Sequence, residues 1–494
     1  MPSPELPDAS AQLRARLAEL SDLGGIAGLM GWDQQTMMPP GGAGPRGAAM
    51  ETLERIAHER ATAPELGALL DTVDGGDPLV RMARRDHDRA RRVPVELAAE
   101  IARVGADAIG VWIQAREESD FAAFRPALER NLELRRRYAE CFPEVDHPYD
   151  ALLDRFEPDM TTAQVREVFA RLRAGLVPLT EAIAAAPAPP LLQGPFDVGE
   201  QRELALEIVR AFGFDDAEWR LDRAVHPFAC AISPTDIRVT GRFDEGSLSG
   251  VFAVMHEVGH GLYEHGVDPE LARTTLGSGA SLGMHESQSR LWENLVGRSE
   301  PFWRHWLPRA RERFPAALGG VSLEDFLRAV NVVRPTLIRV EADEATYSLH
   351  VILRFELEVA LMEGTLSVAE LPEAWNAKMK ELLGIDVPDD ARGVLQDIHW
   401  AHGELGYFPT YALGNIVAAQ LWRAARTDLP ALDDQLAAGD HAPLREWLRE
   451  HVHRHGRLLT PSELLHRATG AELDPQPLLD HLDAKYRALY RLGA

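Results

Sequence analysis

Apolar residues recur at intervals of three and four along most of this 494-residue chain, and this spacing places them on one face of an α-helix. Clear examples are ELRRRYAE (133–140), AQVREVFARLRAGLVPLTEAI (163–183) and YSLHVILRFELEVALMEG (347–364). Thr161 or Thr162 is suited to cap the second segment, because a threonine hydroxyl accepts a hydrogen bond from an unpaired N–H of the first turn. The spacing predicts a mainly α protein.

Three segments interrupt the helical pattern. The proline-rich AAAPAPPLLQGPF (184–196) indicates a linker or surface crossing, and MMPPGGAGPRG (37–47) indicates a loop between two helices. In HPFACAISPTDIRVTGRF (226–243), the alternating DIRVT follows a turn signal, SPT, which is typical of a β-hairpin. We therefore expect a small antiparallel β-sheet within an otherwise helical chain.

Charge and cysteine content narrow the class of protein. The net charge of −25 should repel nucleic acid and anionic membranes, so we expect neither as a partner. The two cysteines, Cys141 and Cys230, form no disulfide framework, which fits a reducing compartment. The N-terminus does not resemble a signal peptide, and no apolar run is long enough to span a membrane. These features favour a cytoplasmic protein.

VMHEVGHGLYEHG (254–266) carries the pattern HExxH on a segment whose helix should start near Ser247 or Ser249 and end at Gly266. His256 and His260 are four residues apart, so a helix places them on one face, where both imidazoles can bind one zinc ion. Glu257 can take a proton from the attacking water. The segment predicts a catalytic metal site.

The third metal ligand must come from another residue. The pattern HExxHxxGxxH fails, because Leu262 and Gly266 stand where glycine and histidine are required. On a helix His265 points about 140° away from His260, and Glu264 also drifts from the shared face. Both are interpreted as ordinary polar residues of the helix end.

A glutamate on a following helix is the other source of a third ligand. GMHESQSRLWENLVG (283–297) offers Glu286 and Glu293, which share a helix face, and Glu286 lies in a polar cluster with His285 and SQS. We interpret Glu286 as the ligand. Glu293 is a candidate to orient a ligand histidine, with a surface salt bridge as its alternative.

Several further segments accompany the metal motif, in the order GWDQQTMMPPGG (31–42), YDALLDRFEPDMTT (149–162), HPF (226–228), DIRVT (236–240), HEVGH, HESQS, LIRVEAD (337–343) and GVLQDIHW (393–400). Together they resemble the carboxypeptidase Taq family of metallocarboxypeptidases. The resemblance covers nearly the whole chain and is far more specific than HExxH alone.

The resemblance implies a single domain over 1–494. Its fold should be similar to neurolysin and angiotensin-converting enzyme, with two lobes flanking a deep active-site groove. It also implies removal of single amino acids from the free C-termini of peptides, with broad specificity and poor action at proline. Zinc is the expected cofactor, Co²⁺ should support activity, and the protein is expected to be a homodimer.

A carboxypeptidase must recognise a terminal carboxylate, which the planar fork of arginine binds with two hydrogen bonds. The candidates are Arg339 and Arg238; the resemblance favours Arg339, and Arg238 is alternatively a structural ion pair. Gln396 of GVLQDIHW is a further candidate for binding substrate.

Amide hydrolysis also requires stabilisation of an oxyanion. By resemblance, His399 and Tyr411 face the scissile bond, and Tyr407 is a substitute. The alternative is that these tyrosines are core aromatics.

Two other functions use the same residues. An endo-acting oligopeptidase would need the same metal site, and a non-catalytic metal-binding scaffold would not need Glu257. HVHRHG (451–456) has histidines four apart but no acidic or cysteine partner nearby, so we interpret it as a helix end. Cys230 is interpreted as a small core residue rather than a nucleophile.

Overall fold

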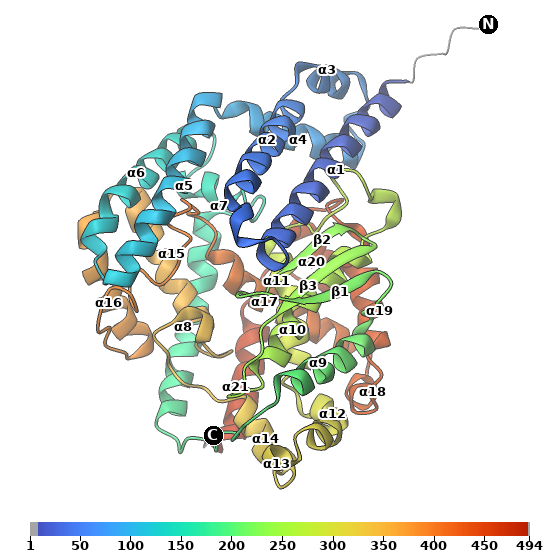
Figure 1. Cartoon of the computed structure of the whole chain (residues 1–494), viewed down its shortest axis with the longest axis vertical. Coiled ribbons are helices and arrows are strands. Elements are labelled where there is room, and N and C mark those ends of the chain that lie inside the picture. Colours follow the sequence, from blue (N-terminus) through green and yellow to red (C-terminus); the bar gives the residue numbers. More distant parts are fainter. Residues whose placement is uncertain (1–7, 493–494) are drawn as a thin grey trace, which may run out of the picture.

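The computed structural model describes residues 8–492, and most of them are in α-helices (Figure 1). The helices before the sheet are α1 (Ala9–Thr36), α2 (Ala43–Ala61), α3 (Pro64–Thr72), α4 (Pro78–Arg92), α5 (Val95–Glu118), α6 (Phe121–Glu140), α7 (Pro148–Leu153), α8 (Thr162–Ala184) and α9 (Val198–Phe212). No helix among these described residues is long and apolar enough to cross a membrane. The predicted mainly helical fold class is confirmed.

The helices after the sheet carry the rest of the chain. They are α10 (Ser249–Gly266), α11 (Leu282–Arg290), α12 (Glu300–Arg313), α13 (Pro315–Leu318), α14 (Leu323–Val330), α15 (Tyr347–Glu363), α16 (Leu371–Leu383), α17 (Pro409–Asp428), α18 (Leu432–Ala437), α19 (Ala442–His451), α20 (Pro461–Thr469) and α21 (Gln476–Tyr490). Helix α11 continues directly into a π-helical segment, η3 (Leu291–Val296). Such π turns are frequent at functional sites.

Local sequence signals set several helix boundaries. The Thr161 side chain accepts a hydrogen bond from the N–H of Gln164, and the Gln164 side chain accepts one from the N–H of Thr161, which forms a capping box. Thr161 is therefore the N-cap of α8.

The loop predicted over 37–47 is shorter than expected, because α1 ends at Thr36, a short 3₁₀ turn spans Pro40–Gly42, and α2 begins at Ala43. Proline fits the first turn of a helix, since its missing N–H has no partner there.

The predicted hairpin is present, but the sheet is mixed rather than antiparallel. Strands β2 (Ala229–Ser233) and β3 (Asp236–Gly241) pair antiparallel, and β1 (Trp219–Arg223) pairs parallel to β3 on its other side. The parallel pair joins segments that are not linked by a hairpin turn, so no local signal announces it. The expectation of an antiparallel sheet is wrong for this edge.

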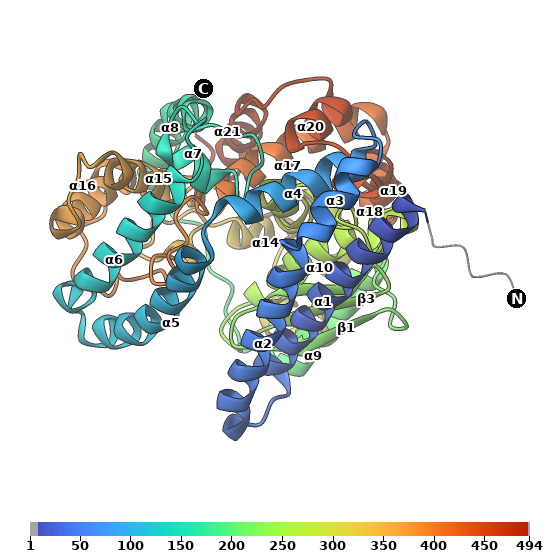
Figure 2. The ribbon, with the colours of Figure 1, turned by 90° about the horizontal axis from the view of Figure 1, so that it is seen from above.

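Two large hydrophobic cores share helix α17. One core is formed mainly by α6, α8, α15 and α16, and the other by α9, α10, α12 and the sheet. Leu413 and Ile416 of α17 belong to the first core, and Leu421 and Trp422 belong to the second. Figure 2 shows these two groups of helices on either side of α17 and α21. The expected two-lobed single domain over 1–494 stays a prediction.

The proline-rich segment predicted as a crossing connects the two cores. It has no helix or strand between the end of α8 at Ala184 and the start of α9 at Val198. Because α8 packs in the first core and α9 in the second, the chain passes from one to the other here.

Candidate metal centre

Helix α10 presents a buried apolar face and a polar face that carries the HExxH residues. Val254, Val258 and Leu262 are buried at the helical spacing, and His256 and His260 follow one another on the other side. Its bounds, Ser249–Gly266, confirm the helix expected from the sequence.

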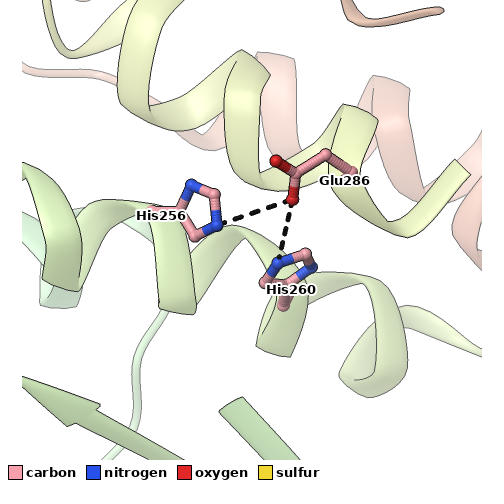
Figure 3. A group of neighbouring side chains, drawn as sticks. All are labelled: His256, His260 and Glu286. Atoms are coloured by element: carbon pink, nitrogen blue, oxygen red, sulfur yellow. Dashed lines mark ion pairs between the residues drawn. The ribbon is translucent and has the colours of Figure 1, made fainter. Parts of the chain in front are cut away.

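Glu286 of α11 faces both histidines of α10 (Figure 3). Its Oε2 lies 3.6 Å from Nε2 of His256 and 3.5 Å from Nε2 of His260. One ligand atom from each of the three residues lies within 4.8 Å of the other two. The sequence therefore selected residues that meet in space, although they come from two helices.

Close helix packing makes this meeting possible. A Cβ added to Gly259 would lie 2.6 Å from Cα of Ser289, so only glycine allows α10 and α11 to approach this closely. On the other side of α11, a Cβ added to Gly414 of α17 would lie 2.6 Å from Cβ of Glu286. Glu286 is thus held between α10 and α17.

The donor set fits a zinc ion. Four ligands at about 2.0–2.1 Å in a tetrahedron lie roughly 3.3–3.4 Å from one another. The two contacts from Glu286 to the histidines approach that separation, and two imidazoles with one carboxylate form a set that zinc accepts while leaving a fourth position open.

Glu293 lies behind His256. Its Oε2 is 3.0 Å from Nδ1 of His256, the ring nitrogen that faces away from Glu286. Burial would raise the pKa of Glu293, but the hydrogen bond with His256 and the charges of Arg290 and Arg298 outweigh it and lower the pKa to about 2. Glu293 is therefore an ionised partner of this histidine and not a surface salt bridge.

Arg290 is a site residue that the sequence analysis missed. Its Nε donates to Oε1 of Glu286 at 2.7 Å, and its Nη1 donates to Oε2 of Glu293 at 3.3 Å. Its guanidinium also lies 4.3 Å from the ring centroid of Tyr347. The only available signal was its position four residues after Glu286, which is also common among exposed helix pairs.

Glu257 is 7% exposed and lies among charged groups. Burial raises its pKa to about 7, and Glu286 and Glu293 add to the effect while His256 opposes it. A divalent cation nearby would favour the carboxylate form. A carboxylate with a pKa near neutrality is suited to accept and then return a proton.

The interpretation of Glu264 as an ordinary helix-end residue is wrong. Its Oε1 lies 2.6 Å from Nε2 of His285 and accepts a hydrogen bond from the N–H of Gly279 at 3.1 Å. The loop that precedes α11 contacts the end of α10 at Glu264, whose side chain is partly buried. His265 instead pairs with Glu218 at 2.8 Å, away from the three candidate ligands.

His399, Tyr407 and Tyr411 lie together near α17. Nε2 of His399 is 3.3 Å from the hydroxyl of Tyr411, and the rings of Tyr407 and Tyr411 are 5.3 Å apart between centroids. Burial lowers the pKa of His399 to about 3, and Arg339 contributes, so the imidazole is neutral. Burial also raises the pKa of Tyr407 to about 12, which keeps its hydroxyl protonated.

Arg339 is buried, with only 4% of its surface exposed, and its hydrogen bonds hold it in a defined orientation. Its Nε and Nη2 donate to Oδ1 of Asp397 at 3.1 and 2.8 Å, and its Nη1 donates to the hydroxyl of Tyr347 at 2.8 Å. Its guanidinium lies 4.7 Å from the ring centroid of Tyr411. The motifs LIRVEAD and GVLQDIHW thus meet beside α17.

Gln396 supports the same arginine. Its Oε1 accepts hydrogen bonds from the backbone N–H of Arg339 at 2.9 Å and from Nη2 of Arg354 at 2.8 Å. Its Nε2 donates to backbone carbonyls, including that of Leu337 at 3.0 Å.

Arg238 makes the ion pair that the sequence offered as its structural alternative. Its Nε and Nη2 donate to the two carboxylate oxygens of Asp236 at 2.9 and 3.0 Å. Its guanidinium also lies 4.3 Å from the ring centroid of Trp32, so DIRVT contacts the N-terminal GWDQQ segment.

Comparison with known proteins gives the family. The family model for the carboxypeptidase Taq (M32) metallopeptidases matches residues 12–486. The chain belongs to this family. Its curated relatives include thermostable carboxypeptidase 1 of Thermus thermophilus, which is 44% identical over 97% of this chain and 98% of the relative. Carboxypeptidase 1 of Bacillus subtilis is 38% identical over 96% of this chain and 97% of the relative's length.

Solved carboxypeptidase structures match nearly the whole fold. The M32 carboxypeptidase of Deinococcus radiodurans R1 matches with a TM-score of 0.96 and 42% identity, over 98% of this chain and 100% of the other. Metallocarboxypeptidase 1 of Trypanosoma cruzi matches with a TM-score of 0.93 and 35% identity, over 97% and 99%. The expected likeness to neurolysin and angiotensin-converting enzyme is not tested by these matches and stays a prediction.

Membership of the M32 metallopeptidases implies a metal cofactor, for which His256, His260 and Glu286 form the candidate site.

The histidines of HVHRHG (451–456) are not among these candidate metal ligands. Helix α19 ends at His451, whose ring stacks on Trp447, and a 3₁₀ turn spans His453–His455. Both cysteines are free, and Cys230 is partly buried.

Proposed function

We propose that this M32 protein is a zinc-dependent carboxypeptidase that removes single amino acids from the free C-termini of peptides. The observation that carries the proposal is the convergence of His256, His260 and Glu286 next to Glu257 in a member of a metallocarboxypeptidase family. A zinc ion bound to these residues would polarise the scissile carbonyl and make water a stronger acid at neutral pH. On this proposal the chain is a glutamate-type HExxH peptidase.

Glu257 acts as the base and then as the acid. It takes a proton from the attacking water and passes it to the nitrogen of the leaving amino acid. Burial raises its pKa and a bound cation would lower it again, so the carboxylate form that accepts the proton is available at neutral pH. A non-catalytic metal scaffold would have no use for a buried carboxylate at this position.

Tyr411 and His399 stabilise the oxyanion that forms on the scissile carbonyl. A Tyr411 hydroxyl aimed at that oxygen supplies a hydrogen bond in the transition state, and neutral His399, 3.3 Å from the same hydroxyl, either orients it or donates directly. Tyr407, whose ring contacts Tyr411, can substitute for it.

Arg339 recognises the terminal carboxylate of the substrate. Asp397 and Tyr347 fix its guanidinium beside Tyr411, and an arginine with fixed geometry loses little conformational freedom when it binds a carboxylate. Gln396 contributes by holding the backbone of Arg339. Arg238 is the second candidate, and its guanidinium pairs with Asp236 as that of Arg339 pairs with Asp397.

The remaining features of the proposal rest on the family. The enzyme accepts many C-terminal residues but acts poorly at proline, Co²⁺ can replace zinc, and the active form is a cytoplasmic homodimer. No nucleic acid or membrane partner is proposed, in keeping with the net charge of −25.

An endo-acting oligopeptidase is the alternative that uses the same metal centre. One peptide, prepared as the free acid and as the C-terminal amide, separates the two when the products are identified by mass spectrometry. A carboxypeptidase releases single residues from the free acid and strongly disfavours the amide. Equal cleavage of both forms at internal bonds would favour the oligopeptidase.

A further inference from the structure

Three side chains form a continuous hydrogen-bonded line behind one candidate metal ligand. Nδ1 of His260 lies 3.1 Å from Nδ1 of His285, and Nε2 of His285 lies 2.6 Å from Oε1 of Glu264. His260 and Glu264 belong to α10, whereas His285 comes from α11. The line therefore links the two helices that carry the metal ligands.

Only one arrangement of protons satisfies this line when His260 binds a metal through Nε2. A neutral imidazole that coordinates through one nitrogen carries its proton on the other, so Nδ1 of His260 is a donor. Nδ1 of His285 must then accept, which leaves the proton of His285 on Nε2. That N–H points at Glu264, a carboxylate able to accept it.

The surroundings hold Glu264 and His285 in place. The backbone N–H of Gly279 donates to the same Oε1 of Glu264, and the ring of Tyr263 packs against the ring of His285 at 5.0 Å between centroids. The Tyr263 hydroxyl in turn accepts a hydrogen bond from the N–H of Ala280 at 3.0 Å. The loop before α11 is thus bonded to α10 through two adjacent residues, Gly279 and Ala280.

The two histidine ligands are supported differently. His256 contacts the carboxylate of Glu293 directly, at 3.0 Å, whereas His260 reaches Glu264 only through an intervening imidazole. Carboxylate partners behind a ligand histidine fix its ring orientation and increase its basicity. An imidazole between them preserves the orientation while placing the negative charge farther from the metal.

We propose that His285 and Glu264 are positioning residues that hold His260 with Nε2 directed at the metal, through the line Glu264–His285–His260. This inference rests on the proposed metal site and deepens it. Neither residue needs to touch substrate or metal. The direct effect of removing either residue should therefore be weaker zinc binding, rather than a change in a chemical step.

Zinc affinity measured by competition with a chelator of known affinity tests the proposal, with the full-length protein first stripped of metal. His285→Ala should weaken zinc binding by about 10- to 100-fold, and Glu264→Gln should weaken it less, because an amide oxygen still accepts a hydrogen bond. His265→Ala is the matched control, since it removes a histidine–glutamate pair from the same helix that does not reach the metal ligands. That control should keep native affinity.

Two amide substitutions separate the hydrogen bonds from simple packing. The asparagine side chain introduced by His285→Asn places its oxygen near the former Nδ1 and can still accept from His260, so it should recover most of the lost affinity. His285→Gln places an amide near the former Nε2, towards Glu264, and should remain weak. Thermal melting of each metal-free variant reports folding, and if His285→Ala does not fold, the Asn, Gln and Glu264→Gln variants carry the test.

The outcomes distinguish this inference from the proposed function. Absence of stoichiometric zinc binding by the native chain would contradict the metal site itself. Native zinc binding together with unchanged affinity in folded His285→Gln and Glu264→Gln variants would overturn the positioning line alone. Equal weakening in His285→Asn and His285→Gln would also overturn it, because the acceptor at Nδ1 would then have no effect.

Discussion

Arg290 contacts the oxygen of Glu286 that does not face the histidines. Its Nε donates to Oε1 at 2.7 Å, whereas Oε2 lies 3.5–3.6 Å from the imidazole nitrogens of His260 and His256. Burial would raise the pKa of Glu286, but Arg290 and the two histidines outweigh it and hold the pKa well below its usual range. The arginine thus keeps a buried carboxylate ionised and fixes its direction.

Arg290→Gln should weaken both the metal site and the fold. Without the guanidinium, Glu286 and Glu293 become adjacent buried carboxylates lacking their common cation. We expect about 10- to 100-fold weaker zinc binding in chelator competition and a loss of about 3–5 kcal/mol of unfolding free energy. Arg304→Gln, which removes an exposed arginine paired with Glu300, should change neither. Native zinc affinity in Arg290→Gln would contradict the role.

Glu257→Gln should separate metal binding from turnover. The amide cannot accept the proton of the attacking water, so kcat should fall by about 100- to 10,000-fold while zinc content and affinity stay near native. Metal analysis and steady-state kinetics on one free-acid peptide measure both. Substantial turnover by a zinc-loaded Glu257→Gln protein would refute the assignment.

Tyr411→Phe should lower kcat by about 100-fold with little change in KM, because the lost hydrogen bond is made to the oxyanion in the transition state. The phenyl ring keeps its packing against Tyr347, which lies 6.0 Å away between centroids. Tyr407→Phe, prepared in parallel, should cost less if Tyr407 is only a substitute. A loss under about threefold for Tyr411→Phe would argue that its ring is merely part of the core.

Arg339→Ala should lower kcat/KM for free-acid peptides by at least about 100-fold while zinc affinity is unchanged, because two charge-assisted hydrogen bonds to the terminal carboxylate are lost. Arg238→Ala, measured on the same peptide, should have a smaller effect on kcat/KM, because Arg238 pairs with Asp236 and stacks on Trp32, a ring that Arg220 also contacts. The reverse order would assign the carboxylate to Arg238.

Glu157 should make stability depend on pH. It is 4% exposed, and burial raises its pKa to about 7 from an ordinary value of 4.5. Between these values the unfolded chain releases a proton that the folded chain retains, so this group's contribution to folding falls as pH rises from about 4.5 to 7, by about 3 kcal/mol in all.

Glu157→Gln should remove that slope. The amide can still accept the hydrogen bond that the N–H of Gly283 donates to the carboxyl at 2.9 Å. Denaturant unfolding of metal-free native and variant proteins across this pH range measures the difference, with the exposed Glu167→Gln as the control. Parallel stability curves for native and Glu157→Gln proteins would show that Glu157 is not the titrating group.

Features set by local spacing were predictable. The pairing of His256 with His260, the capping of α8 by Thr161 and the β2–β3 hairpin each depend on residues within a few positions of one another. Helix periodicity, capping chemistry and turn signals act at that range, so the sequence alone defined the mainly helical class and the helix that carries the metal motif.

Tertiary packing decided the rest. Glu264 contacts His285, Arg339 pairs with Asp397, and β1 pairs in parallel with β3. Each of these contacts joins segments that are separated in the sequence. A helical wheel gave the direction of Glu264 from its own helix but not the loop that contacts it. The sequence by itself determined which residues could bind a metal. The close approach of α10, α11 and α17 at Gly259 and Gly414 determined which groups surround the metal ligands. The physical reason is that burial and charge at a site depend on every neighbouring element.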